Sequence, residues 1–182
     1  SRRVGMNRSK GDLTVIGLGY VGLPLAQNAC HNGYRVTGFD TNKDTVIDLG
    51  NGISHIDGMS DIDVAKMLNS GFSPTDDPAH IEGSDVVVIC VPTPLNEDGV
   101  PDLTAVRQAT ESVASQLRAG TLVVLESTTY PGTTEEIVKP ILEEGSDLEA
   151  GVDFCLAYSP ERIDPGNQVW NLTNTPKVVG GL

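Results

Sequence analysis

Near its start the chain reads Gly17-Leu18-Gly19-Tyr20-Val21-Gly22, with an apolar run before it and a helical pattern after it. A Gly-x-Gly-x-x-Gly turn between a strand and a helix binds the pyrophosphate of a dinucleotide. In such a turn Gly17 allows the tight bend, Gly19 lets the main chain approach the phosphates, and Gly22 lets helix and strand pack closely. The free N–H groups at the helix N-terminus attract the phosphates without any basic side chain. These residues therefore predict a dinucleotide site.

Asp40 ends the second predicted strand, where an acidic side chain binds the hydroxyl groups of the adenosine ribose. A carboxylate there also repels the 2′-phosphate of NADP, so we expect NAD as the cofactor. The nearby Lys43 would reduce this preference for NAD over NADP. The alternative is that Asp40 only caps the helix predicted from Asn42, since Asp is a preferred N-cap residue.

Apolar runs and helical patterns alternate along the chain, which is typical of a parallel sheet covered by helices on both faces. The predicted strands are Leu13–Ile16, Arg35–Phe39, one near Phe72, Asp85–Val91, Leu122–Leu125, Phe154–Tyr158 and Val178–Val179. The predicted helices are Tyr20–Asn32, Asn42–Leu49, Asp61–Asn69, Thr104–Arg118 with Gly120 as its cap, and one that opens with a capping box from Thr133 to Glu136. The expected fold class is α/β, with a Rossmann-type, doubly wound, mainly parallel sheet.

Composition excludes several classes of protein. The net charge is −13 and the 12 Lys and Arg residues are scattered, whereas nucleic-acid backbones are bound by clustered basic side chains, so we expect no nucleic-acid partner. No apolar run is long enough to cross a bilayer, so we expect no membrane association. The cysteines and histidines are dispersed, which favours reduced thiols of a cytoplasmic protein and predicts neither a disulfide framework nor a metal site. They are Cys30, Cys90, Cys155, His31, His55 and His80.

The 182 residues suit a single domain. We expect residues 1–11 to be a flexible leader, because their basic start lacks the apolar stretch of a signal peptide. Residues 12–182 then form one Rossmann domain. Its last predicted strand lies almost at the final residue, which suggests that the chain is cut at a domain edge.

Val91-Pro92-Thr93-Pro94 follows the most apolar predicted strand. Open α/β sheets bind their ligands at the carboxyl ends of their strands, so this segment is expected beside the cofactor. The prolines fix a rigid loop, and the Thr93 hydroxyl is placed to reach the cofactor. The alternative is that the segment is only a turn.

Two later segments are expected at the same edge of the sheet. The first, Glu126-Ser127-Thr128-Thr129-Tyr130-Pro131-Gly132, brings three aliphatic hydroxyl groups there. Such residues often cap helices, but Thr133 can serve as the cap, which leaves Thr128 for another task. The second runs from Ser159 to Asn167, where Glu161 beside an alcohol substrate would act as a base or orient water. The alternative is that Glu161 belongs to a solvated loop.

Together these four segments, in this order, resemble the N-terminal NAD-binding domain of the UDP-glucose/GDP-mannose dehydrogenase family over residues 12–182. The Ser-Thr-Thr-Tyr-Pro-Gly and Ser-Pro-Glu-Arg-x-Asp-Pro-Gly-Asn forms are similar to the branch that acts on UDP-N-acetylglucosamine or UDP-N-acetylmannosamine. Enzymes that act on UDP-glucose typically have Ser-Thr-Val-Pro-Val and Pro-Glu-Phe at these places, and often a glutamate where this chain has Pro165.

The resemblance implies that the 6-hydroxyl of a UDP-sugar is oxidised twice by two NAD, through a thiohemiacetal and a thioester on a cysteine. Thr128 and Glu161 match the catalytic threonine and glutamate. The nucleophilic cysteine, with its lysine and asparagine partners, belongs to a later segment, together with a central helix and a UDP-sugar-binding domain. The full-length enzyme is expected to be cytoplasmic, a homodimer or higher homo-oligomer, and to serve polysaccharide synthesis.

The expected cofactor-binding residues are Gly17, Gly19, Tyr20, Val21, Gly22, Asp40, Lys43, Val91, Pro92, Thr93, Ser127 and Thr128. Two alternatives stay open: the corresponding domain of a UDP-glucose 6-dehydrogenase, and a non-catalytic module that senses NAD. The residues after Leu182 would separate them, because a glycine-rich segment with a cysteine would indicate the enzyme.

Overall fold

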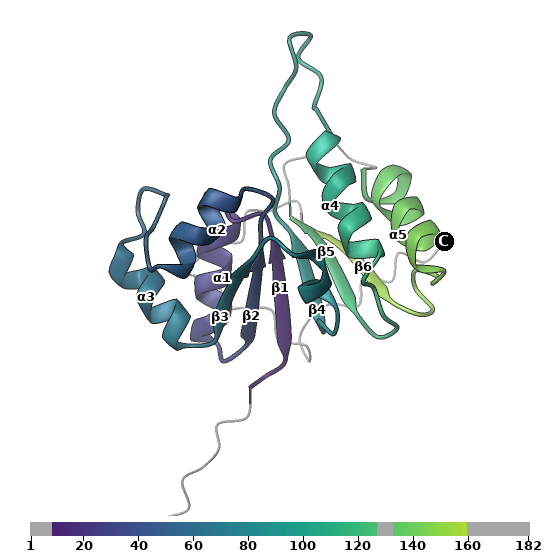
Figure 1. The fold of residues 1–182 in the computed structure, drawn as a ribbon. Helices are drawn as coiled ribbons and strands as arrows, with labels where there is room; N and C mark the ends of the chain where they lie inside the picture. Colours follow the sequence, from purple (N-terminus) through teal and green to yellow (C-terminus); the bar gives the residue numbers. More distant parts are fainter. Residues whose placement is uncertain (1–8, 127–132, 160–182) are drawn as a thin grey trace, which may run out of the picture.

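The computed structural model describes residues 9–126 and 133–159 of the chain (Figure 1). Its strands are β1 (Asp12–Ile16), β2 (Arg35–Phe39), β3 (Phe72–Thr75), β4 (Val86–Ile89), β5 (Leu122–Glu126) and β6 (Cys155–Ser159). Its helices are α1 (Gly22–His31), α2 (Lys43–Gly50), α3 (Asp61–Asn69), α4 (Thr104–Ala114) and α5 (Lys139–Ser146), with a 3₁₀ helix at Pro78–Ile81 and a π-helical turn at Thr134–Val138.

The six strands form one sheet in the order β3-β2-β1-β4-β5-β6, and every neighbouring pair is parallel. The chain builds outward from β1 to β3, then returns to the other side of β1 and builds outward again. This order is that of a doubly wound Rossmann sheet, which confirms the predicted fold class. The order reverses between β1 and β4, and that is where such sheets bind their ligands.

The register brings the carboxyl ends of the strands level with one another. Ile16 pairs with both Phe39 and Ile89, Ile89 pairs with Leu125, and Leu125 pairs with Tyr158. The loops that follow these strands therefore start at the same edge of the sheet, although they are far apart in sequence.

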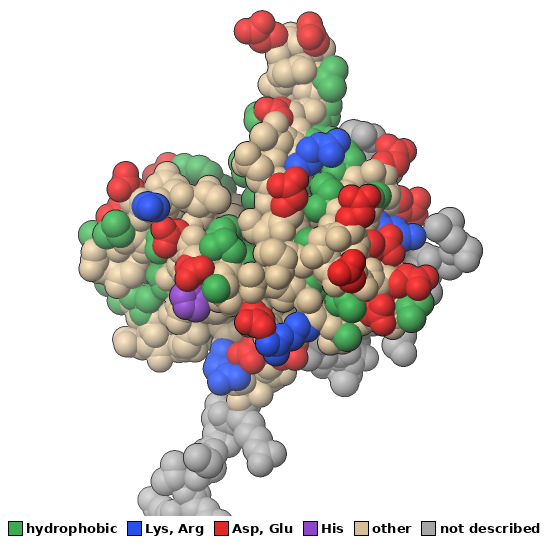
Figure 2. Space-filling model, turned by 45° about the vertical axis from the view of Figure 1, so that its right-hand side comes forward, with side chains coloured by type: hydrophobic (Ala, Val, Ile, Leu, Met, Phe, Trp, Pro, Cys, Tyr) green, Lys and Arg blue, Asp and Glu red, His purple; other side chains and the backbone are tan. Residues whose placement is uncertain are grey.

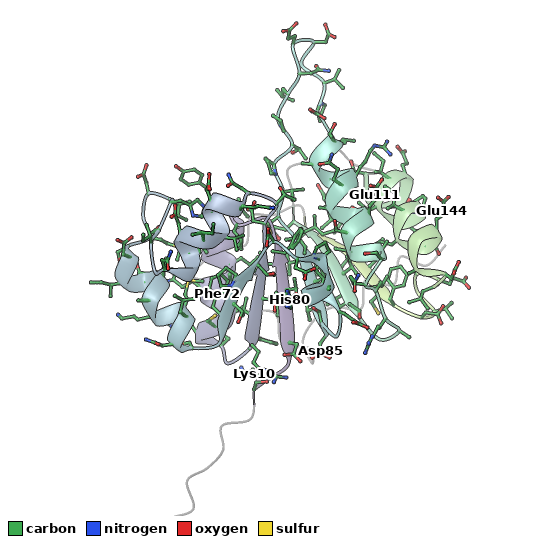
Figure 3. The ribbon with its side chains drawn as sticks, in the orientation of Figure 1. Lys10, Phe72, His80, Asp85, Glu111 and Glu144 are labelled. Atoms are coloured by element: carbon green, nitrogen blue, oxygen red, sulfur yellow. The ribbon has the colours of Figure 1, made fainter. Side chains whose placement is uncertain are left out.

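Each face of the sheet has its own hydrophobic core. Val86 and Val88 of β4 pack into the core shared with α1, α2 and α3, whereas Val87 and Ile89 pack into the core shared with α4 and α5. All four side chains are buried, as the unbroken apolar run predicts for a central strand. Burying each of them contributes about 1.5–3 kcal/mol. Figure 3 shows Glu111 and Glu144 on the outer sides of α4 and α5, and both are exposed.

The predicted boundaries differ from the structure at several ends. Helix α4 stops at Ala114 rather than at residue 118, and Gly120 does not cap it. Gly120 instead has a φ of 89° and donates its N–H to Asp153 O, so its conformational freedom serves the turn into β5. From this turn Leu117 packs against the core that the sheet shares with α4 and α5. The apolar periodicity of the sequence therefore continues past the end of the helix.

Other elements are also shorter than predicted. Helix α1 begins at Gly22, not at Tyr20, and β4 ends at Ile89, before Val91. Thr133 is buried and already helical, so it does not occupy the N-cap position. The reason for freeing Thr128 from a capping role is therefore lost, and only the motif supports its function. Thr128 and the strand predicted at residues 178–179 lie outside the described residues.

The segment between β4 and α4 contains an arm, residues 94–102, which projects from the body of the molecule (Figure 1). Asp102 N donates to Pro94 O at its base over 2.7 Å, and Asn96 N donates to Val100 O further out over 2.8 Å. Acidic side chains gather at its tip (Figure 2), where Glu97 and Asp98 are exposed. The arm is not predicted from the sequence.

Candidate cofactor-binding site

A cleft of about 720 Å³ lies at the carboxyl edge of the sheet. Its walls come from the segments after β1, β2 and β4, from the last residues of β5 and β6, and from one side of α4. The level strand ends explain why these distant segments meet. The cleft thus occupies the reversal point of the strand order, the site at which Rossmann folds bind dinucleotides.

The three glycines of the turn after β1 differ in what surrounds them. A Cβ on Gly17 would lie 2.9 Å from Cys90 O, and its φ of 91° suits glycine. A Cβ on Gly22 would lie 1.7 Å from Gly17 O, so α1 packs too closely on the turn for any side chain. A Cβ on Gly19 would meet no protein atom within 4 Å. Gly17 and Gly22 are therefore needed by the fold, whereas the space beside Gly19 is left open for a ligand.

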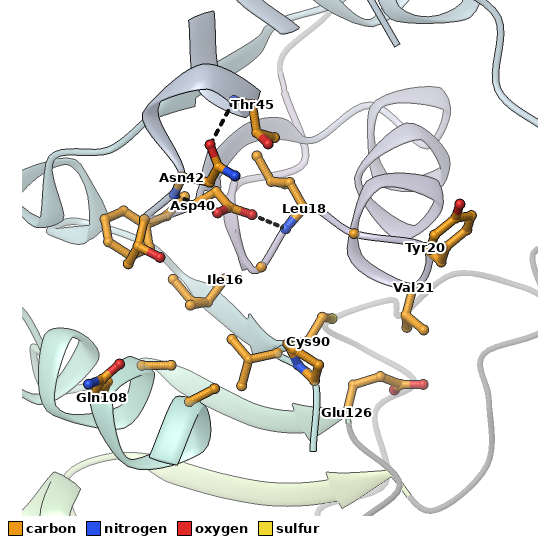
Figure 4. Close-up of a pocket in the computed structure, with 18 of the residues that line it drawn as sticks. Ile16, Leu18, Tyr20, Val21, Asp40, Asn42, Thr45, Cys90, Gln108 and Glu126 are labelled. Atoms are coloured by element: carbon orange, nitrogen blue, oxygen red, sulfur yellow. Dashed lines mark hydrogen bonds between the residues drawn. The ribbon is translucent and has the colours of Figure 1, made fainter. Parts of the chain in front are cut away.

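Asp40 joins the glycine turn to the start of α2. Its Oδ2 accepts a hydrogen bond from Leu18 N and its Oδ1 accepts one from Asn42 N, each over 2.9 Å (Figure 4). Asn42, not Asp40, caps α2, because its side-chain oxygen accepts from the N–H groups of Asp44 and Thr45. Asp40 therefore does not cap the helix; it supports the turn and lines the cleft.

His55 completes the support of the turn from the opposite side. It lies in the loop between α2 and α3, and its Nε2 is 2.6 Å from Leu18 O. A carbonyl oxygen can only accept, so Nε2 carries the proton and donates. Asp40 thus holds the N–H of Leu18 and His55 holds its C=O, so the peptide groups on both sides of Leu18 are fixed. No sequence motif marks His55, which stands 37 residues from Leu18.

The side of α4 that faces the cleft is built from small and polar residues. Ala105 and Ala109 line the cleft together with Phe39 of β2, and the exposed Gln108 adds an amide. Small side chains on this helix leave room for a flat ring against an apolar floor. Sequence reasoning missed these residues, because the helical pattern of α4 indicates only which side faces the core.

The half of the cleft formed by β4, β5 and β6 contains Cys90 and Glu126, both buried (Figure 4). Burial, and secondly the negative charge of Glu126, raise the pKa of the Cys90 thiol far above its ordinary value. Burial also raises the pKa of Cys30, to about 11. Both cysteines therefore stay protonated at neutral pH and are poor nucleophiles. Cys155 is exposed, and all three cysteines are free.

The structure brings most of the predicted cofactor-binding residues together. Those that line the cleft are Gly17, Gly19, Tyr20, Val21, Asp40, Val91, Pro92 and Thr93. Gly22 packs beneath the turn, and Lys43 is exposed at the start of α2 without lining the cleft. Ser127, Thr128 and Glu161 lie outside the described residues.

In residues 9–126 and 133–159, no three His, Cys, Asp and Glu side chains are grouped so that they would hold a metal ion. None of the helices in these residues has both the length and the apolar character needed to span a membrane.

Known proteins resemble this chain along most of its length. Residues 11–182 match the NAD binding domain of the UDP-glucose/GDP-mannose dehydrogenase family. The chain is 40% identical over 176 residues to Protein CapL of Staphylococcus aureus, covering 97% of this chain and 40% of that protein. It is 40% identical over 170 residues to UDP-N-acetyl-D-glucosamine 6-dehydrogenase of Pseudomonas aeruginosa, covering 93% of this chain and 39% of that enzyme.

Among solved structures, the chain resembles UDP-D-ManNAc dehydrogenase from Pyrococcus horikoshii with a TM-score of 0.78 and 39% identity, over 85% of this chain and 37% of that one. The chain thus spans about two fifths of the length of these relatives. The resemblance inferred from the four motifs is confirmed. This chain belongs to the UDP-glucose/GDP-mannose dehydrogenase family, and it corresponds to the NAD-binding domain of that family.

Proposed function

We propose that this chain holds NAD for a dehydrogenase that oxidises the C6 hydroxyl of UDP-N-acetylglucosamine or UDP-N-acetylmannosamine to the uronic acid with two NAD. The observation that carries the proposal is the cleft at the reversal of the strand order, with Asp40 bonded to the glycine turn inside it. Relatives named for each of the two sugars support the substrate class.

The adenosine half of NAD fits the part of the cleft formed after β1 and β2. The open space beside Gly19, at the N-terminus of α1, accommodates the pyrophosphate without a basic side chain. Asp40 has further acceptor capacity on both oxygens for the ribose hydroxyls. Phe39 and Ala109 supply an apolar surface for the adenine ring, beside the amide of Gln108.

The nicotinamide half then falls to the segments after β4, β5 and β6. When bound, NAD accepts the hydride removed from C6 of the sugar. Val91, Pro92 and Thr93 hold that half in place, and Tyr20 and Val21 contact the cofactor from the turn that precedes α1. By motif position Ser127 contacts the cofactor, Thr128 orients the reacting oxygen or water, and Glu161 acts as the base. Lys43 does not line the cleft, so we give it no direct contact.

Calorimetric titration of the chain with NAD and with NADP tests the cofactor part of the proposal. We expect NAD to bind more tightly, because Asp40 would face a 2′-phosphate. A hydrogen bond to a charged group contributes about 1.5–3 kcal/mol, so Asp40→Ala should weaken NAD about ten-fold or more. Asp44→Ala, which changes an exposed carboxylate outside the cleft, should leave NAD binding nearly unchanged. Equal affinities for NAD and NADP would refute the role of Asp40.

The substrate part is tested on the full-length enzyme. Turnover with UDP-N-acetylglucosamine, UDP-N-acetylmannosamine and UDP-glucose is followed by NADH formation, and two NADH are expected for each sugar oxidised. A clear preference for UDP-glucose would favour that alternative, and binding of NAD without any turnover would favour a sensing module.

The proposal extends to location and assembly. Three free cysteines suit a reducing compartment, which supports a cytoplasmic location. A homodimer or higher homo-oligomer is what the family resemblance implies for the full-length enzyme. Sedimentation of that enzyme measures its assembly directly, and a monomer would contradict this part.

A further inference from the structure

We propose that Glu126 makes the site hold oxidised NAD⁺ more tightly than NADH, by placing a buried negative charge at the nicotinamide half of the cleft. This inference rests on the proposed binding of NAD in the cleft. It assigns to Glu126 the discrimination between the two oxidation states of the cofactor.

The position of Glu126 follows from the fold. It is the last residue of β5, it pairs in register with Ser159 of β6, and both residues line the cleft. Asp40 and the glycine turn assign β1 and β2 to the adenosine half of the dinucleotide. A doubly wound sheet binds the two mononucleotide halves on the two sides of its reversal point, so β4, β5 and β6 receive the nicotinamide. Figure 4 shows Asp40 and Gln108 toward one side of the cleft and Glu126 toward the other.

The burial of Glu126 strengthens its electrostatic effect. Glu126 is only 4% exposed. Two charges that are shielded from water interact several times more strongly than two charges in water. Glu126 also lies close enough to Cys90 that its negative charge, second to burial, contributes to raising the pKa of that thiol. A cationic group bound in the same half is stabilised by that carboxylate.

The nicotinamide ring carries a positive charge in NAD⁺ and none in NADH. The rest of the molecule is the same in both forms, so contacts of the adenosine half cancel when the two affinities are compared. Hydride transfer from the C6–H bond of the sugar cancels the ring charge and removes its attraction to Glu126. Two NAD are used for each sugar in the proposed reaction, so weaker retention of NADH favours its exchange for the second NAD⁺.

The test measures the dissociation constants of NAD⁺, NADH and ADP-ribose for the wild-type chain and for Glu126→Gln, which keeps the shape of the side chain. We expect the wild-type chain to bind NAD⁺ about ten-fold more tightly than NADH. In Glu126→Gln this ratio should fall to near unity, a change of about 30 mV in the potential of the bound two-electron couple. ADP-ribose lacks the nicotinamide, so its affinity should stay within about two-fold.

The controls separate charge from structure. Glu126→Asp keeps the charge and should keep most of the ratio, and Glu111→Gln removes an exposed charge outside the cleft and should change nothing. An equal weakening of all three ligands in Glu126→Gln would mean a structural role and would overturn the inference. So would a wild-type chain that binds NADH as tightly as NAD⁺, a result that needs no variant. If the wild-type chain binds none of the three ligands, the proposed function itself fails.

Discussion

Leu18 shows how single residues build the cofactor site. Asp40 accepts from its N–H and His55 donates to its C=O, so two side chains fix the two peptide planes that flank Leu18, beside the open space at Gly19. The turn is therefore held by the fold before any ligand arrives. Preorganisation of this kind reduces the entropy lost when a ligand binds.

Gly19 and Gly22 should respond in opposite ways to substitution. Gly19→Val adds a side chain where no protein atom lies within 4 Å, and the φ of Gly19 is not left-handed, so the fold should tolerate it while NAD binding is lost. Gly22→Ala would place a Cβ 1.7 Å from Gly17 O and should lower stability by about 1–3 kcal/mol or more. Thermal unfolding followed by circular dichroism, with NAD titration, measures both effects. Loss of the fold in Gly19→Val would show that this glycine is structural as well.

Removal of the His55 side chain should weaken NAD binding without unfolding the chain. A neutral hydrogen bond contributes about 0.5–1.5 kcal/mol, so His55→Ala should raise the dissociation constant by about two- to ten-fold. His80→Ala is the matched control, because His80 bonds to Thr75 Oγ1 and does not line the cleft. Calorimetry on both variants provides the measurement, and identical affinities would show that the turn keeps its shape without His55.

At the scale of elements, the strands were the easiest to predict and the helix ends the hardest. A strand such as β4, buried on both faces, must be apolar throughout, and the structure confirms all six strands predicted within the described residues. Helix ends depend on local turns, which is why α4 is shorter than predicted although Leu117 continues its apolar pattern. The arm at residues 94–102 was missed because its hydrogen bonds join residues of the arm to one another, and such a segment shows no periodic pattern of apolar residues in the sequence.

Helix α3 offers a test of stability that is independent of the cleft. Ser60 caps it with a full capping box, in which Asp63 N donates to the Ser60 hydroxyl oxygen and Ser60 N donates to the Asp63 carboxylate. Ser60→Ala should lower the free energy of unfolding by about 1 kcal/mol. Urea unfolding measures this change, while NAD affinity should stay the same because Ser60 does not line the cleft. A parallel loss of NAD affinity would mean that α3 supports the site through the loop that carries His55.

At the scale of the whole molecule, the sequence predicted correctly where the site lies, but it did not predict several of the residues that line it. The glycine turn, Asp40 and Thr93 were predicted because each follows a strand in a recognisable motif, and the structure brings all of them to one cleft. His55 and Gln108 were not predicted as site residues, since only the three-dimensional fold places a loop and a helix side there. Glu126 begins a segment that was expected at this edge, but no role of its own was predicted for it. The motif residues Thr128 and Glu161 remain predictions.

The state of its thiols limits the chemistry that this chain can perform by itself. Cys90 lines the cleft and Cys30 lies in the hydrophobic core, and both thiols stay protonated. Neither residue offers a thiolate that could hold an aldehyde, so this chain alone should not form uronate. In the full-length enzyme Glu161→Gln should slow turnover by about 10²–10⁴-fold and leave NAD affinity nearly unchanged. Single-turnover measurements with the preferred UDP-sugar give the rate, and a wild-type rate would assign Glu161 to a solvated loop.

The level register of the strands has a practical consequence for the opposite edge of the sheet. The loops after β1, β2 and β4, which line the cleft, leave from the carboxyl ends of the strands, whereas Lys10 and Asp85 lie at the amino ends, a full strand length away (Figure 3). The cleft and the amino edge therefore lie at opposite ends of the sheet. A surface tether or fluorescent reporter attached beside Lys10 would leave the cleft open to solvent, so the amino edge is the suitable place for immobilising this chain as an NAD sensor.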